Sequence, residues 1–159
     1  MKMRKIVAAL MAVLMICCLI PFAAVAEDAS AVIDFTDKAN RTHYSTEQQI
    51  WEQNGIKLVN DKSSSTSNVA DYANPARFYA SSKITVTAPG KITKIVYDAN
   101  NTSYATAMKN SIGTVSNANV TVSSDKVTVT YSTGVDVVTV AKLSGQVRMD
   151  SITVTYVAE

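Results

Sequence analysis

Cysteine, histidine and glycine are scarce in this 159-residue chain, and their placement excludes several kinds of site. Cys17 and Cys18 are adjacent near the N-terminus, which leaves the rest of the chain without a disulfide or a thiol. His43 is the single histidine, so a zinc site lacks ligands and a Ser-His-Asp triad lacks a nucleophile motif around it. The five glycines are dispersed, so phosphate-binding fingerprints are missing too. We therefore expect that the protein is not an enzyme, although paired carboxylates leave a small hydrolase as a distant alternative.

The N-terminus has the pattern of a secretion signal. Lys2, Arg4 and Lys5 precede an uncharged apolar run, residues 6–22, and the sequence AVA at residues 24–26 offers the small side chains that a signal peptidase accepts. We predict a signal peptide over residues 1–26. A retained membrane anchor is the alternative, because the apolar run is close to the minimum length that spans a bilayer.

The predicted mature chain, residues 27–159, has almost no net charge. Loss of the three basic residues of the signal leaves 12 basic against 13 acidic side chains. Nucleic acid and anionic membranes attract proteins with basic clusters, and none is present here. We therefore expect a secreted, extracellular protein with no nucleic-acid partner and no membrane association after cleavage. A mature chain of this length suffices for one domain, which we expect to be monomeric.

Short runs of alternating apolar and polar residues predict β-strands throughout the mature chain. The clearest runs, rich in Val, Ile, Thr and Tyr, are residues 83–88, 91–98, 120–123, 127–131 and 146–157, with further candidates at 31–36, 50–52, 56–60 and 77–80. Pro89-Gly90 and Ser124-Asp125 are predicted turns. Residues 135–143 have apolar side chains at both odd and even positions, which is typical of a strand covered on both faces.

One segment has helical spacing. Apolar residues recur every four positions at Tyr104, Met108 and Ile112. Thr102 or Ser103 is available as N-cap and Gly113 can end the helix, so the pattern predicts one short helix here. Residues 45–48, STEQ, have the form of a capping box but could open no more than a turn. Eight or nine strands and one short helix predict an all-β fold, an antiparallel β-sandwich of jelly-roll type, with an up-and-down barrel as the alternative.

Two segments depart from the regular strand pattern. In the last strand the apolar parity changes between Met149 and Ile152, which requires a bulge at Asp150-Ser151 that either twists a sheet edge or redirects Asp150. Residues 60–74, NDKSSSTSNVADYAN, form a connection too long and too polar for a hairpin, and such loops are usually functional or mobile. The aromatic residues around its end indicate that this loop docks onto the sandwich.

Several strings of the mature chain resemble a set of secreted β-sandwich modules of gut Firmicutes and related bacteria. They are WEQNGI (51–56), NDKS (60–63), TSNVADYANPARF (66–78) and KITKIVY (91–97), together with residues 104–113 and 145–156. The resemblance covers nearly the whole mature chain, and TSNVADYANPARF is a specific string. Modules of that set occur alone or attached to extracellular enzymes, among them nucleases and glycan-degrading proteins. The resemblance therefore implies a non-catalytic accessory module.

Residues 146–154, QVRMDSITV, are also similar to the last strand of galactose-binding-like jelly-roll modules. In those modules an acidic residue near this position often helps to hold a structural calcium ion, which implies a metal site at Asp150. Their paired N-terminal acidic motif has no clear match here, and Asp34 and Asp37 are the nearest residues to it. Asp and Asn oxygens suit calcium. The alternative is that these residues end strands through turn hydrogen bonds.

A carbohydrate site needs an aromatic face beside planar polar side chains. If the long loop folds over the strand that carries Trp51, this set is supplied by Trp51, Asn60, Tyr72, Arg77 and Tyr79. We therefore expect weak binding of an extracellular polysaccharide, for which a neutral polymer is the best fit. In the alternative, a structural or adhesive cell-surface protein, Trp51 belongs to the core and Tyr72 fixes the loop.

Overall fold

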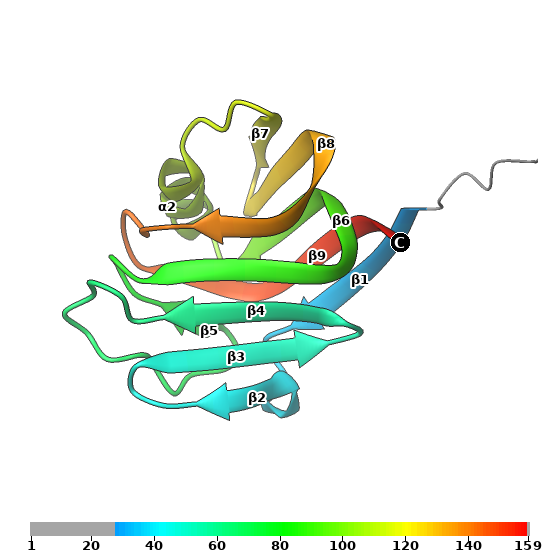
Figure 1. Cartoon of the computed structure of the whole chain (residues 1–159). Coiled ribbons are helices and arrows are strands. Elements are labelled where there is room, and N and C mark those ends of the chain that lie inside the picture. The colour runs from blue at the N-terminus through cyan, green and yellow to red at the C-terminus, as the bar shows by residue number, and fades with distance from the viewer. Residues whose placement is uncertain (1–27, 159) are drawn as a thin grey trace, which may run out of the picture.

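The computed structural model describes residues 28–158, so the predicted signal peptide and its cleavage site lie outside the described residues. A single antiparallel sheet of nine strands curls on itself, and one helix lies at its open side (Figure 1). The strands are β1 (Asp28–Asp34), β2 (Arg41–Tyr44), β3 (Gln48–Gln53), β4 (Ile56–Asp61), β5 (Ala76–Phe78), β6 (Lys83–Ala99), β7 (Ala118–Ser123), β8 (Lys126–Val140) and β9 (Val147–Ala158); the helix is α2 (Thr102–Ile112), and a short 3-10 helix is η1 (Lys38–Asn40). None of the helices in residues 28–158 is long and apolar enough to cross a membrane.

The long strand β6 joins the two halves of the sheet. Its first part pairs with β4 and with the end of β8, whereas its second part pairs with β9 and with the beginning of β8. One half therefore has the order β2-β3-β4-β6-β8, and the other has the order β1-β9-β6-β8-β7, with β5 also paired to β9. Figure 1 shows β6 bending as it passes from one half to the other.

The predicted turn at Pro89-Gly90 is wrong, because both residues lie inside β6. The ladder with β4 ends at Thr87, so the missing N–H of Pro89 removes no hydrogen bond from it. Gly90 then pairs with β9 so closely that a Cβ atom would lie 2.0 Å from the backbone oxygen of Val157. The pair is a bend within one strand because proline is tolerated where a ladder stops and glycine where two backbones approach.

Alternate side chains of the strands fill the space between the two halves. The largest fully buried side chains come from the strands, from α2 and from the segments between elements: Trp51, Tyr97, Phe35, Phe78, Ile33, Ile56, Leu58, Ile84, Ile92, Ile95, Met108 and Leu143. The ring of Phe35 packs edge-on against Trp51 at 5.1 Å and against Phe78 at 5.7 Å between centroids. The contact of Phe35 with Trp51 joins the segment after β1 to β3 of the other half. The predicted all-β antiparallel sandwich with one short helix is confirmed.

Two local predictions need correction. Residues 135–143 are not covered on both faces: Val138 and Val140 are buried, whereas Val137 is 50% exposed, because only one face of this part of β8 packs against the core. The predicted helix is confirmed, but its N-cap is Asn101, whose Oδ1 accepts a hydrogen bond from the backbone N–H of Tyr104 at 3.1 Å. The STEQ string forms the turn between β2 and β3. There the hydroxyl oxygen of Ser45 accepts hydrogen bonds from the backbone N–H groups of Glu47 and Gln48.

Candidate functional site

Two of the five residues predicted to bind carbohydrate are in the core. Trp51 is 0% exposed and Asn60 is 1% exposed, so neither offers a surface to a ligand, and their assignment to the site is wrong. The physical reason is the alternation of β3 and β4, which directs Trp51 and Asn60 inward together with Gln49 and Leu58.

Tyr72 and Arg77, in contrast, are brought together. Tyr72 is 48% exposed, and the Cζ atom of Arg77 lies 3.9 Å from the centroid of its ring. In β5 the neighbours Ala76 and Phe78 are buried, so Arg77 lies on the outer side of the strand. Tyr79 follows the end of β5, and its carbonyl oxygen accepts a hydrogen bond from the Ser82 hydroxyl at 2.8 Å, so its backbone belongs to the turn that leads into β6.

A second arginine lies directly beside the first. β5 pairs with β9 in a register that places Arg77 opposite Arg148, and Val147 and Met149 on either side of Arg148 are buried. Both guanidinium groups therefore lie on the outer face, where like charges at opposite positions repel. Neither arginine has a carboxylate partner within 4.0 Å among residues 28–158.

Arg148 contacts an aromatic ring of α2 and has an unsatisfied hydrogen-bond donor. Its Cζ atom lies 5.2 Å from the centroid of the Tyr104 ring, which belongs to α2. Its Nε is buried and has no hydrogen-bond partner among the described residues, and the same is true of Nε2 of Gln146. We call the set of Tyr72, Arg77, Tyr104, Gln146 and Arg148 the arginine face. It combines two aromatic rings with two guanidinium groups that have no carboxylate partner among residues 28–158, an arrangement suited to an acceptor supplied by a ligand.

The predicted bulge lies beside this face and is confirmed. Asp98 of β6 faces Ser151, whereas Ala99 faces Met149, so Asp150 is the extra residue of β9. The carboxylate of Asp150 accepts from Nδ2 of Asn100 at 3.4 and 3.5 Å. Within the described part of the chain, no group of three or more His, Cys, Asp or Glu side chains gathers as a metal site would require. Calcium at Asp150 stays a prediction.

The other two carboxylates considered for calcium have local partners. Asp34 accepts from the backbone N–H of Thr36 at 2.8 Å and from its hydroxyl at 2.7 Å. These hydrogen bonds lower the pKa of Asp34 below its usual value. Asp37 accepts from the backbone N–H of Ala39 and so caps η1. Both residues therefore act as turn and cap residues, which matches the alternative interpretation of the acidic loops.

The long loop, residues 62–75 between β4 and β5, holds Tyr72 in place. Val69 and Ala70 are buried, the backbone N–H of Val69 donates to the carbonyl of Thr46 at 2.8 Å, and its carbonyl accepts from the hydroxyl of Tyr44 at 3.2 Å. Asp71 forms ion pairs with Arg41 and with Lys38. The predicted docking of this loop is confirmed.

The ion pairs of Asp71 make the docking dependent on pH. Hydrogen bonds from Lys38 and Arg41 lower the pKa of Asp71 below the ordinary Asp value of 3.8. This contribution to stability is therefore fully present above 3.8 and is lost as the pH falls through the folded-state pKa. We predict that Asp71→Asn is less stable than wild type at neutral pH and that the difference disappears in acid. Urea denaturation at a series of pH values measures it, with Asp136→Asn, an exposed residue of β8, as the matched control that should show no such trend.

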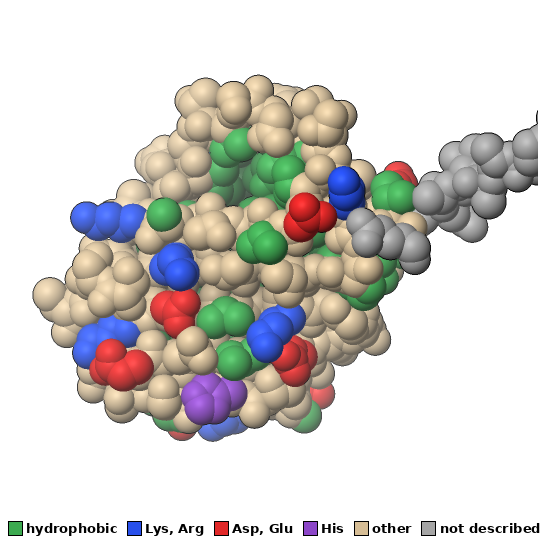
Figure 2. Space-filling view, in the orientation of Figure 1, with side chains coloured by type: hydrophobic (Ala, Val, Ile, Leu, Met, Phe, Trp, Pro, Cys, Tyr) green, Lys and Arg blue, Asp and Glu red, His purple; other side chains and the backbone are tan. Residues whose placement is uncertain are grey.

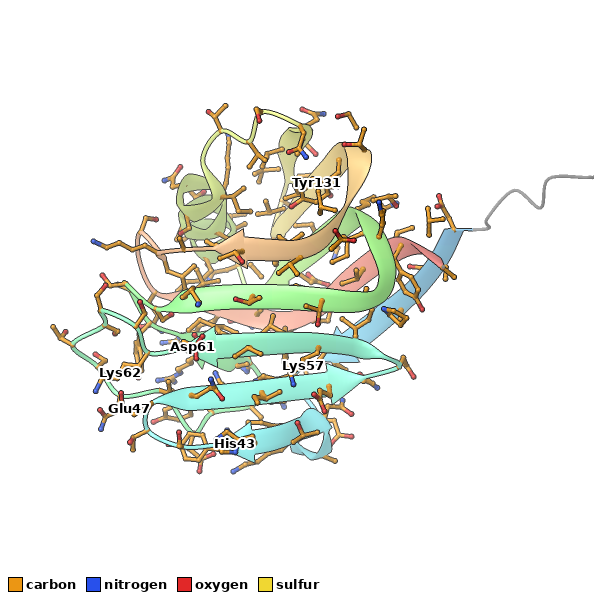
Figure 3. All side chains as sticks on the ribbon, viewed as in Figure 1. His43, Glu47, Lys57, Asp61, Lys62 and Tyr131 are labelled. Carbon is orange, nitrogen blue, oxygen red and sulfur yellow. The ribbon has the colours of Figure 1, made fainter. Side chains whose placement is uncertain are left out.

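A concavity of about 510 Å³ opens between β8, the end of α2 and the segment before β7. Figure 2 shows a hollow with hydrophobic side chains at its floor, and Tyr131, labelled in Figure 3, lines it. At its base the hydroxyl of Tyr97 is buried without a hydrogen-bond partner among the described residues. Burial raises the pKa of both tyrosines, so both hydroxyls stay protonated. The concavity arises from the bend of β8, which the sequence pattern divided into two strands.

The face of the sheet that Figure 2 shows below this concavity carries charges of both signs. Its ion pairs include Lys57 with Glu52 at 3.1 Å and Lys83 with Asp61 at 3.7 Å. His43 lies exposed on the edge strand β2 (Figure 3). Pairs of this kind are typical of a solvated surface and contribute little to stability.

Searches of protein-family models, of curated proteins and of solved structures found no match to this chain. The function must therefore be argued from the arginine face itself. Of its five residues, Tyr72 and Arg77 were predicted from the sequence, whereas Tyr104, Gln146 and Arg148 were missed. The available signal was an arginine placed between two core residues in both ARF (76–78) and VRM (147–149).

Proposed function

We propose that the protein is a secreted, non-catalytic module that binds an extracellular carbohydrate at the arginine face. The observation that carries this proposal is the half-exposed ring of Tyr72, one face of which is covered by the guanidinium of Arg77 while nearly half of the residue remains exposed. An aromatic ring can pack against the C–H face of a pyranose, while a planar guanidinium donates hydrogen bonds to neighbouring oxygens. These are the two elements that sugar recognition requires.

The position of the arginine face favours a polymer over a small molecule. It lies on the outer side of β5 and β9 and does not line the 510 Å³ concavity between β8 and α2. A sugar chain that lies along an open face buries few groups, and each sugar offsets only part of the translational freedom lost on binding. The expected dissociation constant per site is about micromolar to millimolar.

Affinity electrophoresis tests the proposal. Native gels containing galactan, xylan, polygalacturonate or dextran sulfate should show retardation of the wild type by at least one polymer. Tyr72→Ala should weaken that binding by about tenfold, which corresponds to about 1.4 kcal/mol. Tyr72→Phe should retain it, because the phenyl ring keeps the aromatic face and no hydrogen bond of the Tyr72 hydroxyl is required.

The melting temperature of both variants should stay close to that of the wild type, since Tyr72 is half exposed. Retardation that is the same for wild type and Tyr72→Ala would show that the sugar binds elsewhere. No retardation by any of the four polymers would contradict the proposed function and favour a structural or adhesive role.

A further inference from the structure

The arrangement of Arg77 and Arg148 is electrostatically unfavourable in the protein alone. Directly opposed residues of an antiparallel pair have Cβ atoms about 4.5–5.5 Å apart, and like-charged side chains at such positions destabilise the sheet. Six other cations of residues 28–158 have a carboxylate partner, namely Lys38, Arg41, Lys57, Lys62, Lys83 and Lys126. Lys91, Lys94, Lys109 and Lys142 have none within that range, but no two of these four are paired directly opposite each other in a ladder, as Arg77 and Arg148 are. The two arginines therefore hold unneutralised positive charge side by side.

Arg41 shows how the same protein neutralises an arginine that stacks on aromatic rings. Its Cζ atom lies 4.6 Å from the Tyr44 ring and 5.6 Å from the Trp51 ring, and its guanidinium binds the carboxylate of Asp71. Arg77 and Arg148 have the equivalent aromatic contacts with Tyr72 and Tyr104 but lack the carboxylate. By this comparison, the missing partner of the arginine face is an oxyanion.

The donors of the arginine face are also held in fixed positions. The rings of Tyr72 and Tyr104 each pack against a guanidinium, and the long loop and α2 fix those rings from two sides of the β5–β9 pair. Arginine presents its N–H groups as a planar fork that matches a carboxylate or a sulfate.

The nearest acid along β9 does not supply that acceptor. Asp150 is two residues beyond Arg148, but it occupies the bulge, and its carboxylate accepts from Asn100. It forms no ion pair with Arg148 among the described residues, because no N–O distance between the two is within 4.0 Å. The bulge thus leaves the positive charge of the arginine face available to a ligand.

We infer that the sugar bound at this face is acidic and that its oxyanion, the carboxylate of a uronic acid or a sulfate ester, is held between Arg77 and Arg148. This inference rests on the proposed function and names the substrate class of the same site. Charge-assisted, bidentate hydrogen bonds are the strongest that the face can offer, so the acidic group provides most of the selectivity. The ring of Tyr72 then contacts the sugar that carries the acid.

Pairs of polymers that differ only in their acidic groups show whether the protein recognises the acid or the sugar chain that carries it. Polygalacturonate should retard the wild type, whereas its fully methyl-esterified form should retard it at least about tenfold less; dextran sulfate and dextran form the equivalent pair for sulfate. Stronger selectivity within the first pair identifies a uronate ligand, and within the second a sulfated one. Arg77→Gln and Arg148→Gln should each lose about tenfold in affinity for the preferred acidic polymer.

Lys94→Gln is the matched control, because it removes one exposed positive charge from β6, outside the arginine face. It should leave retardation unchanged, which distinguishes the arginine face from a general attraction of the acidic polymer to positive charge. The melting temperature of Arg148→Gln should not fall, because the substitution relieves the repulsion with Arg77. Equal losses in all three variants would overturn the inference.

Failure of the inference and failure of the proposed function give different results. Retardation by esterified pectin or dextran as strong as by the acidic forms would overturn the acidic ligand and leave carbohydrate binding standing. Retardation by no polymer would contradict carbohydrate binding. Melting curves with sodium galacturonate and with sodium sulfate then test whether Arg77 and Arg148 bind an oxyanion at this site. A rise in melting temperature for wild type but not for Arg77→Gln or Arg148→Gln supports that site, and equal curves overturn it.

Discussion

Replacement of Trp51 by alanine should lower the free energy of unfolding by about 3–5 kcal/mol. The indole is 0% exposed, packs edge-on against Phe35 at 5.1 Å between centroids and lies beneath the guanidinium of Arg41. Its removal leaves a large cavity in the core and takes away one of the two rings that contact Arg41. Urea denaturation followed by far-ultraviolet circular dichroism measures the change.

The control for Trp51→Ala is Tyr72→Ala, which removes an aromatic ring that is 48% exposed. A substitution of this kind at the surface should change the free energy of unfolding by no more than about 0.5 kcal/mol. The two variants should therefore have opposite profiles, one unstable and the other stable but weak in carbohydrate binding. A stable Trp51→Ala protein that had lost only its binding would return Trp51 to the ligand site.

Substitution of Gly90 by alanine should be similarly harmful, with a loss of about 3 kcal/mol. The added Cβ would lie 2.0 Å from the carbonyl oxygen of Val157 and 3.0 Å from Cα of Ala158, and backbone atoms of a paired strand cannot move aside without breaking the ladder. β6 and β9 would separate at the bend that joins the two halves of the sandwich. The midpoint of urea denaturation measures this loss.

Gly145→Ala is the matched control for Gly90→Ala. A Cβ atom at position 145 would meet the Cβ of Ala107 at 3.8 Å, an ordinary contact, and no closer atom. This variant should unfold at nearly the same urea concentration as the wild type. If Gly90→Ala were equally stable, β6 and β9 would not approach as closely at the bend as described.

Features set by neighbouring residues could be predicted from the sequence, and the bulge is one example. The parity change between Met149 and Ile152 is local, and only an unpaired residue can reconcile it with a continuous strand. The helix could also be predicted, because its apolar spacing and the glycine that ends it, Gly113, lie within one segment of the sequence. The β3–β4 turn at Asn54-Gly55, where φ is 53° and 80°, carried a strong hairpin signal that the sequence interpretation did not use.

The candidate site was only partly predictable because it depends on pairings between distant segments. The string QQIWEQ is compatible with either face of β3 pointing inward, and only the packing of Phe35 against Trp51 decides between them. Arg77 and Arg148 likewise become neighbours only through the register of β5 with β9. Pro89-Gly90 was misinterpreted for a related reason, since the same pair serves as a turn or as a bend according to the strands beside it.

The most direct test of the arginine face is a titration of ¹⁵N-labelled protein with trigalacturonate, followed by nuclear magnetic resonance of backbone amides, arginine Nε–Hε groups and the indole N–H. The account predicts that the Nε–Hε signals of Arg77 and Arg148, the side-chain amide of Gln146 and the backbone amides of residues 76–78 and 147–149 shift together, while the indole of Trp51 does not. Shifts confined to residues around Tyr131 or His43, or no shift at the two arginines either with trigalacturonate or in a parallel titration with an oligosaccharide of dextran sulfate, would contradict it.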